Sequence, residues 1–195
     1  MYATVHRIDG APGPQDDTWD DAVLTALSAA AVPLGTLVAR PVGVGPGLAV
    51  ALWRDAPGAV TPGAAGRVTV GAGAAYRIDT HRAGWSARPA RYLQMTTFTG
   101  RDEDWCAAFD RSGEERIWPA VKDLPGLVGL LTGSTPEGDR IALILADSVE
   151  ALEANAAAIM STELLPWEDP AHLTGPDELA ILRLLHADVP VGADR

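Results

Sequence analysis

Residues 115–160, ERIWPAVKDLPGLVGLLTGSTPEGDRIALILADSVEALEANAAAIM, carry the pattern that decides the fold class. A helical stretch stops at Pro125 and Gly126, and two apolar runs, Leu127–Leu131 and Arg140–Ala146, follow on either side of the turn TPEGD. Ser148 can cap a further helix, VEALEANAAAIM, in which apolar residues recur at helical spacing. The stretch therefore predicts helix, strand, strand and helix in that order.

The residues on both sides complete a unit of six elements. Tyr92–Thr99 alternates polar and apolar residues, which predicts a strand, and GRDEDW then opens the first helix with acidic residues. Gly113 and Pro119 are expected to break that helix into pieces. Leu179–His186 predicts a last strand. The second half, residues 91–190, is thus expected to be β-α-β-β-α-β, the ferredoxin-like arrangement.

The first half, residues 1–84, repeats most of this order. One helix is expected over residues 16–31, and strands are expected over residues 2–8, 34–41, 48–54, 67–70 and 75–81. A second helix is missing, and residues 85–90, WSARPA, are interpreted as a linker. The sequence therefore predicts an α+β fold of two ferredoxin-like halves, the first of them degenerate. One continuous α+β domain whose halves only look alike is the alternative.

Composition excludes several classes of protein. The chain has 195 residues and a formal net charge of -11, and no two of its Lys and Arg residues are adjacent, so nucleic acid and anionic lipid are not expected partners. The single cysteine, Cys106, rules out an internal disulfide or a zinc site with two thiolates, and we expect it to be a buried apolar residue. The sequence has no signal-peptide pattern and no apolar run long enough to span a membrane, so a cytoplasmic location is expected. Its Ala- and Gly-rich, Lys-poor composition is typical of a GC-rich genome.

Residues 115–160, together with LLPWEDP (164–170) and LTGPDELAIL (173–182), resemble proteins of the dimeric α+β barrel superfamily. Within it the sequence is most similar to the antibiotic biosynthesis monooxygenase-like group, over about half of the chain, residues 91–187. The resemblance implies that ferredoxin-like units pair through their sheets and close a barrel. A tandem chain would close it within one polypeptide, as a monomer or as part of a homodimer, with one pocket between the sheet and the helices of the second half.

The resemblance also implies a function. Cofactor-independent oxygenases of this group oxidise polycyclic phenols whose anion itself reacts with oxygen, so an aromatic or polyketide-like substrate and no bound cofactor are expected. The alternative is a non-catalytic protein of the same superfamily that binds a small molecule or haem. Haem-degrading relatives use an Asn, Trp and His set, whereas the one asparagine here, Asn155, falls on the second helix rather than the first strand. No HxH, HxxE or HExxH spacing occurs, so no metal site is expected.

The candidate site residues lie in the second half. Aromatic walls hold flat ligands well, which makes core packing or ligand binding the two interpretations of its aromatic residues. The expected ligand-binding residues are Trp105, Phe109, Trp118, Gln94 and Thr96, and the expected catalytic residues are His186, Tyr92 and Arg116.

Three of these candidates carry an expectation about their position. On the strand that begins at Tyr92, we expect Tyr92, Gln94 and Thr96 to face the barrel interior and Leu93 and Met95 to face the helices. His186 in the last strand is expected to approach His6 in the first, since a closed barrel brings its ends together. Arg116 could hold an anionic substrate group, or form a surface ion pair with Glu115 or Asp123.

Overall fold

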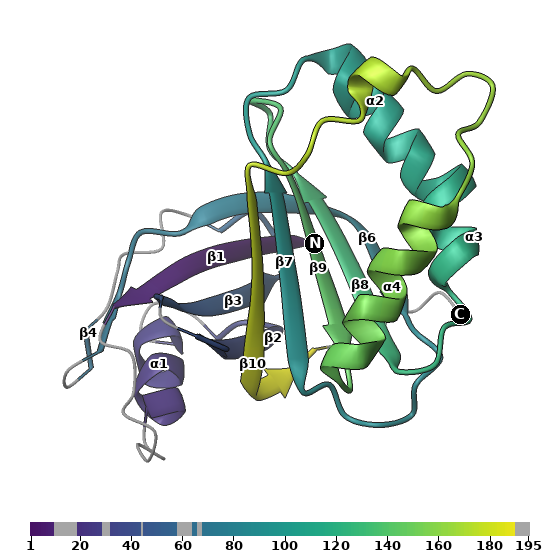
Figure 1. The fold of residues 1–195 in the computed structure, drawn as a ribbon. Coiled ribbons are helices and arrows are strands. Elements are labelled where there is room, and N and C mark those ends of the chain that lie inside the picture. The colour runs from purple at the N-terminus through teal and green to yellow at the C-terminus, as the bar shows by residue number, and fades with distance from the viewer. Residues whose placement is uncertain (10–18, 29–31, 44, 58–63, 66–67, 190–195) are drawn as a thin grey trace.

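Eight strands form a closed barrel in the computed structural model, which describes residues 1–9, 19–28, 32–43, 45–57, 64–65 and 68–189 (Figure 1). Around the barrel the strands follow the order β3-β2-β10-β7-β9-β8-β6-β1, and the pairing of β1 with β3 closes the ring. Every pair is antiparallel. Their bounds are β1 Tyr2–Asp9, β2 Gly35–Pro41, β3 Gly47–Trp53, β6 Ala74–Ala83, β7 Tyr92–Phe98, β8 Leu127–Ser134, β9 Arg140–Ala146 and β10 Glu178–Asp188.

Two groups of four strands make up the ring. Strands β10, β7, β9 and β8 lie side by side, and so do β6, β1, β3 and β2. In each group the order across the sheet is the fourth, first, third and second strand of that group along the chain. The groups join where β6 pairs with β8 and where β2 pairs with β10. Both joins lie within one chain, so the barrel needs no second copy to close.

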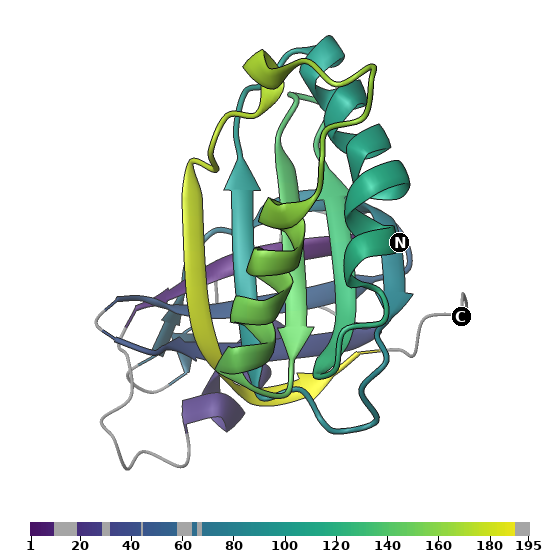
Figure 2. The same cartoon turned by 45° about the vertical axis from the view of Figure 1, so that its right-hand side comes forward.

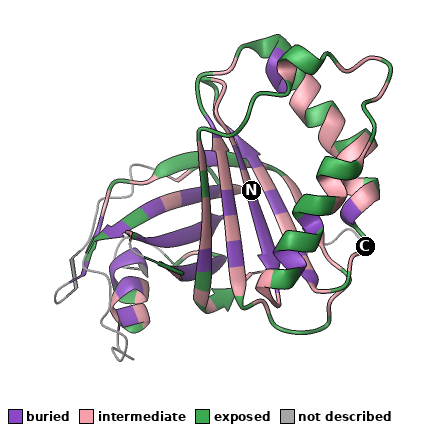
Figure 3. Ribbon diagram, in the orientation of Figure 1, coloured by how far each residue is buried: buried purple, intermediate pink, exposed green. Residues whose placement is uncertain are grey.

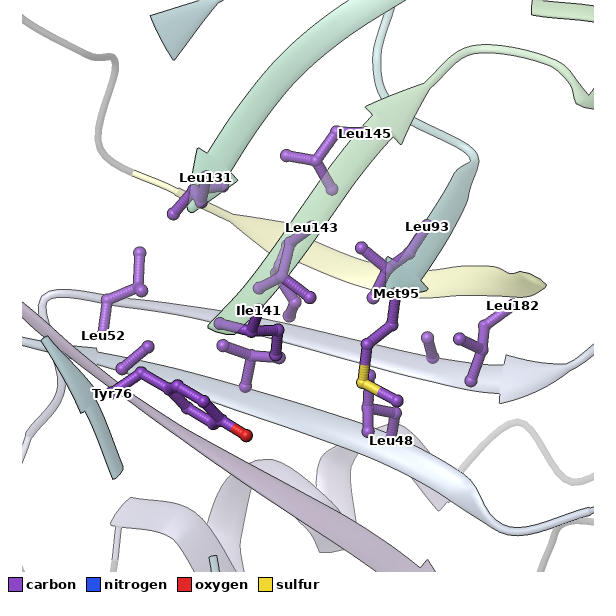
Figure 4. Close-up of a cluster of buried hydrophobic side chains, with 14 residues drawn as sticks. Leu48, Leu52, Tyr76, Leu93, Met95, Leu131, Ile141, Leu143, Leu145 and Leu182 are labelled. Atoms are coloured by element: carbon purple, nitrogen blue, oxygen red, sulfur yellow. The ribbon is translucent and has the colours of Figure 1, made fainter. Parts of the chain in front are cut away.

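The interior of the barrel is packed with apolar side chains from both groups of strands (Figure 4). Leu93 and Met95 of β7 lie in this cluster with Leu143 of β9 and Leu48 of β3. The expectation that Tyr92, Gln94 and Thr96 face the interior is therefore wrong, and the opposite face of β7 does so. A closed barrel excludes water from its interior, so it takes the larger apolar side chains of each strand, whereas its outer face is only partly covered by helices.

On the first group of strands, helix α1 (Trp19–Ser28) covers the outer face. Trp19, Val23 and Leu27 of this helix are buried against Val38 and Trp53 of the sheet. Two short strands, β4 (Ala64–Ala65) and β5 (Val68–Val70), extend the sheet beyond β1. The expected helix was longer, and residues 16–18 and 29–31 of it lie outside the described part of the chain.

On the second group, two helical segments cover the outer face (Figure 2). The first runs through α2 (Glu103–Ser112), the π-helical turn η1 (Gly113–Ile117) and α3 (Trp118–Val121), and the second is α4 (Val149–Ser161). The expected break at Gly113 and Pro119 is replaced by this wider turn. Pro119 falls in the first turn of α3, where a missing N–H costs the helix least. A 3-10 turn, η2 (Pro170–His172), lies between α4 and β10.

Side chains cap the starts of α2 and α4, and the cap at Ser148 was predicted. The Asp102 carboxylate accepts a hydrogen bond from the Trp105 backbone N–H at 2.8 Å, and the Ser148 hydroxyl accepts one from the Ala151 N–H at 3.2 Å. No helix in the described residues is long and apolar enough to cross a membrane.

Candidate ligand-binding site

A cavity of about 560 Å³ lies between the outer face of the second group of strands and the helices α2–η1 and α4. Apolar clusters close its two ends. At one end Val121, Leu127 and Leu152 pack where α3 and α4 meet the sheet, and at the other end Phe98 packs on Trp105 of α2. These clusters hold the helices against the sheet at both ends and leave the middle hollow. The cavity therefore lies between the second group of strands and its helices, as the resemblance implies, and β6 of the first group forms one side of it.

The floor of the cavity consists of two rows of side chains that cross the sheet. One row runs from Thr96 through Ala142 and Thr132 to Thr80, each opposite the next on the neighbouring strand. The other row runs through Gln94, Ile144, Leu130 and Arg82. Because Ala142 is the smallest of these side chains and has threonines on both sides, the floor combines depth with hydroxyl groups that can donate and accept hydrogen bonds.

The helical side of the cavity is aromatic and apolar. Phe109 of α2 lies with its ring centroid 5.1 Å from that of Phe98, and Trp118 stacks under the Arg82 guanidinium at 4.7 Å from its ring. Helix α4 contributes Ile159 and the amide of Asn155. Such a combination of flat walls and a few polar groups is typical of sites for small aromatic molecules.

Three carboxylates line the cavity, and each of them is paired with an arginine. The Asp79 carboxylate lies 2.8 Å from Arg77, the Asp110 carboxylate lies 3.1 Å from Arg140, and Glu114 pairs with Arg82. Burial of the Arg140 guanidinium opposes its charge, but its hydrogen bonds to Asp110 and the negative charges of Asp110 and other nearby groups together raise its pKa. These pairs leave the rim of the cavity close to electrically neutral.

A second cavity of about 550 Å³ adjoins the first under residues 162–176 and shares Phe98, Phe109 and Ile159 with it. Its polar side is the ion pair of Arg116 with Glu168, at 2.9 Å, whose side chains are 9% and 4% exposed. Ser112 and the Leu165 N–H also donate to Glu168. Burial raises the pKa of Glu168, but these donors and Arg116 together lower it below its ordinary value.

The expected ligand-binding residues come together at these cavities. Phe109, Trp118, Gln94 and Thr96 line the larger cavity. Trp105 lines the smaller one, and its indole N–H donates to the His172 carbonyl at 2.9 Å. Gln94 and Thr96 reach the cavity because their face of β7 points outward to the helices rather than into the barrel.

The three expected catalytic residues are not brought together. Arg116 lines the smaller cavity, where its partner is Glu168 and not Glu115 or Asp123 as expected. Tyr92 packs against the apolar cluster at the end of α4, and His186 lies on β10 opposite Val38 of β2. Neither Tyr92 nor His186 is among the residues that line the two cavities.

His6 and His186 do not approach each other, so that expectation is wrong. His6 lies opposite Ala49, Ala49 lies opposite Val38, and Val38 lies opposite His186. Two strands thus stand between the histidines, which separates their backbones by about 14 Å. His6 is fully buried, its Nδ1 is 3.0 Å from the Gly71 carbonyl, and burial lowers its pKa. The barrel closes through β3, and the two histidines lie on strands that β3 and β2 keep apart.

Cys106 is buried as expected, and burial raises the pKa of its thiol, which disfavours a nucleophilic thiolate. Within the described residues, no three His, Cys, Asp or Glu side chains lie close enough together to hold a metal ion. The larger cavity therefore offers amides, hydroxyls, paired charges and aromatic rings to a ligand.

Several lining residues were not predicted, and strand pairing explains why. Asp79, Thr80 and Arg82 come from β6, a strand of the first group, and reach the cavity because β6 pairs with β8. Alternate residues of the expected strand at 75–81 could have been tested for a lining face, but nothing local identifies β8 as its neighbour. Asn155 had a stronger signal, since it is a polar residue on the apolar face of a predicted helix.

No protein-family model matches the chain, and no curated protein matches it in sequence. Solved structures do match. A provisionally assigned monooxygenase from Fusobacterium nucleatum is 8% identical with a TM-score of 0.62, and the match covers 100% of this chain and 97% of that one. An anthrone oxidase-like protein is 13% identical with a TM-score of 0.54, over 96% and 92% of the two chains. A haem-degrading enzyme from Listeria monocytogenes is 11% identical with a TM-score of 0.52, over 94% and 99%. At these identities the likeness concerns the fold alone, and it confirms the expected closed α+β barrel.

Proposed function

We propose that the chain binds a flat aromatic molecule in the larger cavity and oxidises it with dioxygen, without a bound flavin or metal. The observation that carries this proposal is the cavity itself, with Trp118, Phe109 and Phe98 on its walls and a row of threonines on its floor. Its volume of about 560 Å³ is in the range of small-molecule sites. An anthrone oxidase-like protein and a provisionally assigned monooxygenase share the fold, which supports the same class of reaction.

The proposed reaction needs a substrate that supplies its own electrons. A phenolic ring system that loses a proton becomes an electron-rich anion, and dioxygen then converts a ring CH2 group into a carbonyl, with the second oxygen atom leaving as water. Glu114 is the carboxylate placed to accept the proton, and Arg82 beside it is placed to hold the anion. The apolar walls keep water from the reacting carbon.

A second candidate function is binding without catalysis, and one observation favours it. All three carboxylates that line the larger cavity are paired with arginine, so each already has a partner within the protein. Among the described residues, the lining of that cavity also includes no histidine, tyrosine or cysteine. Haem therefore lacks its usual protein ligands there, and His172 lines only the smaller cavity.

We also propose that the two groups of strands are two ferredoxin-like halves fused in one chain, residues 1–84 and 91–190. Their identical strand order supports this interpretation. So does the placing of α1 and of α2–α3 after the first strand of each group. In the described part of the first half, no helix corresponds to α4, which agrees with a half that acts mainly as the partner for barrel closure.

The test uses anthrone as the substrate probe and follows oxygen uptake with an electrode and quinone formation by absorbance. The full chain is expected to accelerate both, and Trp118→Ala is expected to lower the catalysed rate at least about tenfold by removing a wall of the cavity. Trp85→Ala is the matched control, since Trp85 is 74% exposed and lies outside both cavities. Binding of anthrone without oxygen uptake would favour the second candidate function, and no binding would overturn both.

A further inference from the structure

We propose that the Asn155 amide selects the ligand, by donating a hydrogen bond to an oxygen atom carried directly on its aromatic ring system. This inference rests on the proposed binding of a flat aromatic molecule in the larger cavity. It adds that the molecule presents a carbonyl or phenolate oxygen to helix α4, and that a bare hydrocarbon of the same shape is rejected.

The position of Asn155 in α4 is one that packing assigns to an apolar residue. Ala151 and Leu152 lie four and three positions before Asn155, and Ile159 lies four positions after it. Ala151, Leu152 and Ile159 all belong to the cluster that packs α4 on the sheet. Asn155 is only 3% exposed, and it is the one asparagine in the chain. A leucine here would fit the pattern of the helix better and would carry no polar group into the interior.

The amide has an uncommitted donor. Among the described residues, no atom accepts a hydrogen bond from the Asn155 Nδ2, although this atom is buried. A buried donor without a partner destabilises the folded state, so such groups are rare in proteins and tend to mark functional sites. Asn155 lines the larger cavity but its Nδ2 is covered, so a ligand there supplies the missing acceptor when the amide turns toward it.

On the α4 side of the cavity, Asn155 is surrounded by apolar lining residues. Helix α4 contributes four lining residues, and the other three, Ala156, Ile159 and Met160, are apolar. The second amide of the lining, Gln94, lies on the floor and already has the Thr96 hydroxyl at 3.5 Å. An oxygen atom that a ligand buries against α4 therefore finds one side-chain donor among these four residues. A ligand with that oxygen gains a hydrogen bond to a donor that is otherwise unpaired, and a ligand without it gains none, so the site prefers the first.

The test compares two probes of one shape, anthraquinone-2-sulfonate and anthracene-2-sulfonate, which differ in the two ring carbonyls. The quenching of tryptophan fluorescence gives the dissociation constant of each. The full chain is expected to bind the quinone at least about tenfold more tightly than the hydrocarbon, as one good hydrogen bond allows. Asn155→Leu, which is close to Asn in size, is expected to bring the two constants within about twofold.

A thermal melt adds a readout that a merely structural asparagine would not give. Asn155→Leu removes the unpaired donor, so its midpoint is expected to stay level or rise by roughly 2–4 °C while selectivity is lost. Glu153→Gln, on the exposed side of the same helix, is the control and is expected to keep the selectivity of the original chain. Asn155→Ala replaces the leucine variant if that variant does not fold.

The outcomes separate this inference from the proposed function. Tight binding of both probes with a ratio of constants that Asn155→Leu leaves unchanged would overturn the role of Asn155 and leave the cavity as a binding site. No binding of either probe by the full chain would overturn the proposed function, and this inference with it.

Discussion

Helices cover the barrel on two sides (Figure 3), and the packing beneath them differs between the two sides. Under α1 the space is full, because Trp19, Val23 and Leu27 pack directly on the sheet and each is at most 2% exposed. Under α2 and α4 the space is hollow, although the strands below follow the same order. In the first case large side chains occupy the middle of the covered face, and in the second they occupy its two ends.

Because of this difference, the filled face contributes mainly to stability, and the hollow face has room for a ligand. The filled face and the barrel interior together bury most of the apolar side chains of the core. The hollow face is held open by its end clusters and by polar contacts such as Arg116 with Glu168. A chain that closes its own barrel can therefore leave one covered face unfilled, since the other supplies apolar burial.

The largest expected effect comes from removing the same residue type from each side. Trp19→Ala is expected to lower the free energy of unfolding by about 3–5 kcal/mol, since it empties a packed site. Trp118→Ala is expected to cost less, about 1–2 kcal/mol, because its half-buried ring borders the cavity and loses only part of its packing on the apolar cluster together with its contact with Arg82. Urea unfolding measures both, and equal losses would contradict the contrast between the two faces.

The next effect concerns the ion pair that fastens residues 162–176 over the smaller cavity. Arg116→Ala leaves the Glu168 carboxylate buried without its cation and is expected to cost about 3 kcal/mol in the free energy of unfolding. Arg111→Ala is the control, since Arg111 and Glu115 are an exposed pair, for which a much smaller loss is expected. A cost for Arg116→Ala no larger than that of the control would mean that this pair does not hold the cover in place.

Substitutions that enlarge a side chain should affect stability differently on the filled face and on the hollow face. A Cβ at Gly47 would lie 2.5 Å from the Trp19 ring, so Gly47→Ala is expected to destabilise the protein by about 1–3 kcal/mol. Ala142→Leu adds more atoms on the cavity floor, yet is expected to change stability by less than about 0.5 kcal/mol. The same variant should weaken binding of anthraquinone-2-sulfonate at least about tenfold by filling the cavity. Normal binding by Ala142→Leu would place the ligand elsewhere.

The smallest effect is a pH dependence that belongs to the filled face. Burial lowers the pKa of His6, partly offset by its hydrogen bond to Gly71, so below pH about 6.5 the unfolded chain takes up a proton that the folded chain refuses. Stability is therefore complete above this pH and is expected to fall on acidification, by at most about 1.4 kcal/mol per pH unit for this group. His6→Gln should flatten the dependence measured by urea unfolding between pH 7.5 and 5.5. His81, whose pKa burial also lowers, should account for the remaining slope.

Much of the local structure could be predicted from the sequence. The alternation in Tyr92–Phe98, the caps Asp102 and Ser148, and the turn between β8 and β9 all specify elements through neighbouring residues. Phe109 and Trp118 line the larger cavity, and their residue type and their helix suffice to predict that position. The face of β7 was assigned wrongly because alternation shows that two faces differ and does not show which of them lies inside a barrel.

The sequence alone thus determined the elements, their order, the acidic surface and the side-chain types available to a site. Only the tertiary structure decided which strands are neighbours and that β6 of the first group of strands lines the cavity over the second group. It also decided that, among the described residues, no atom accepts a hydrogen bond from the buried Asn155 Nδ2. The physical reason is the distance along the sequence between the residues that interact. Helices, turns and caps arise from contacts between residues a few positions apart, whereas barrel closure, burial and the volume left between a helix and a sheet depend on residues that meet only after the chain has folded.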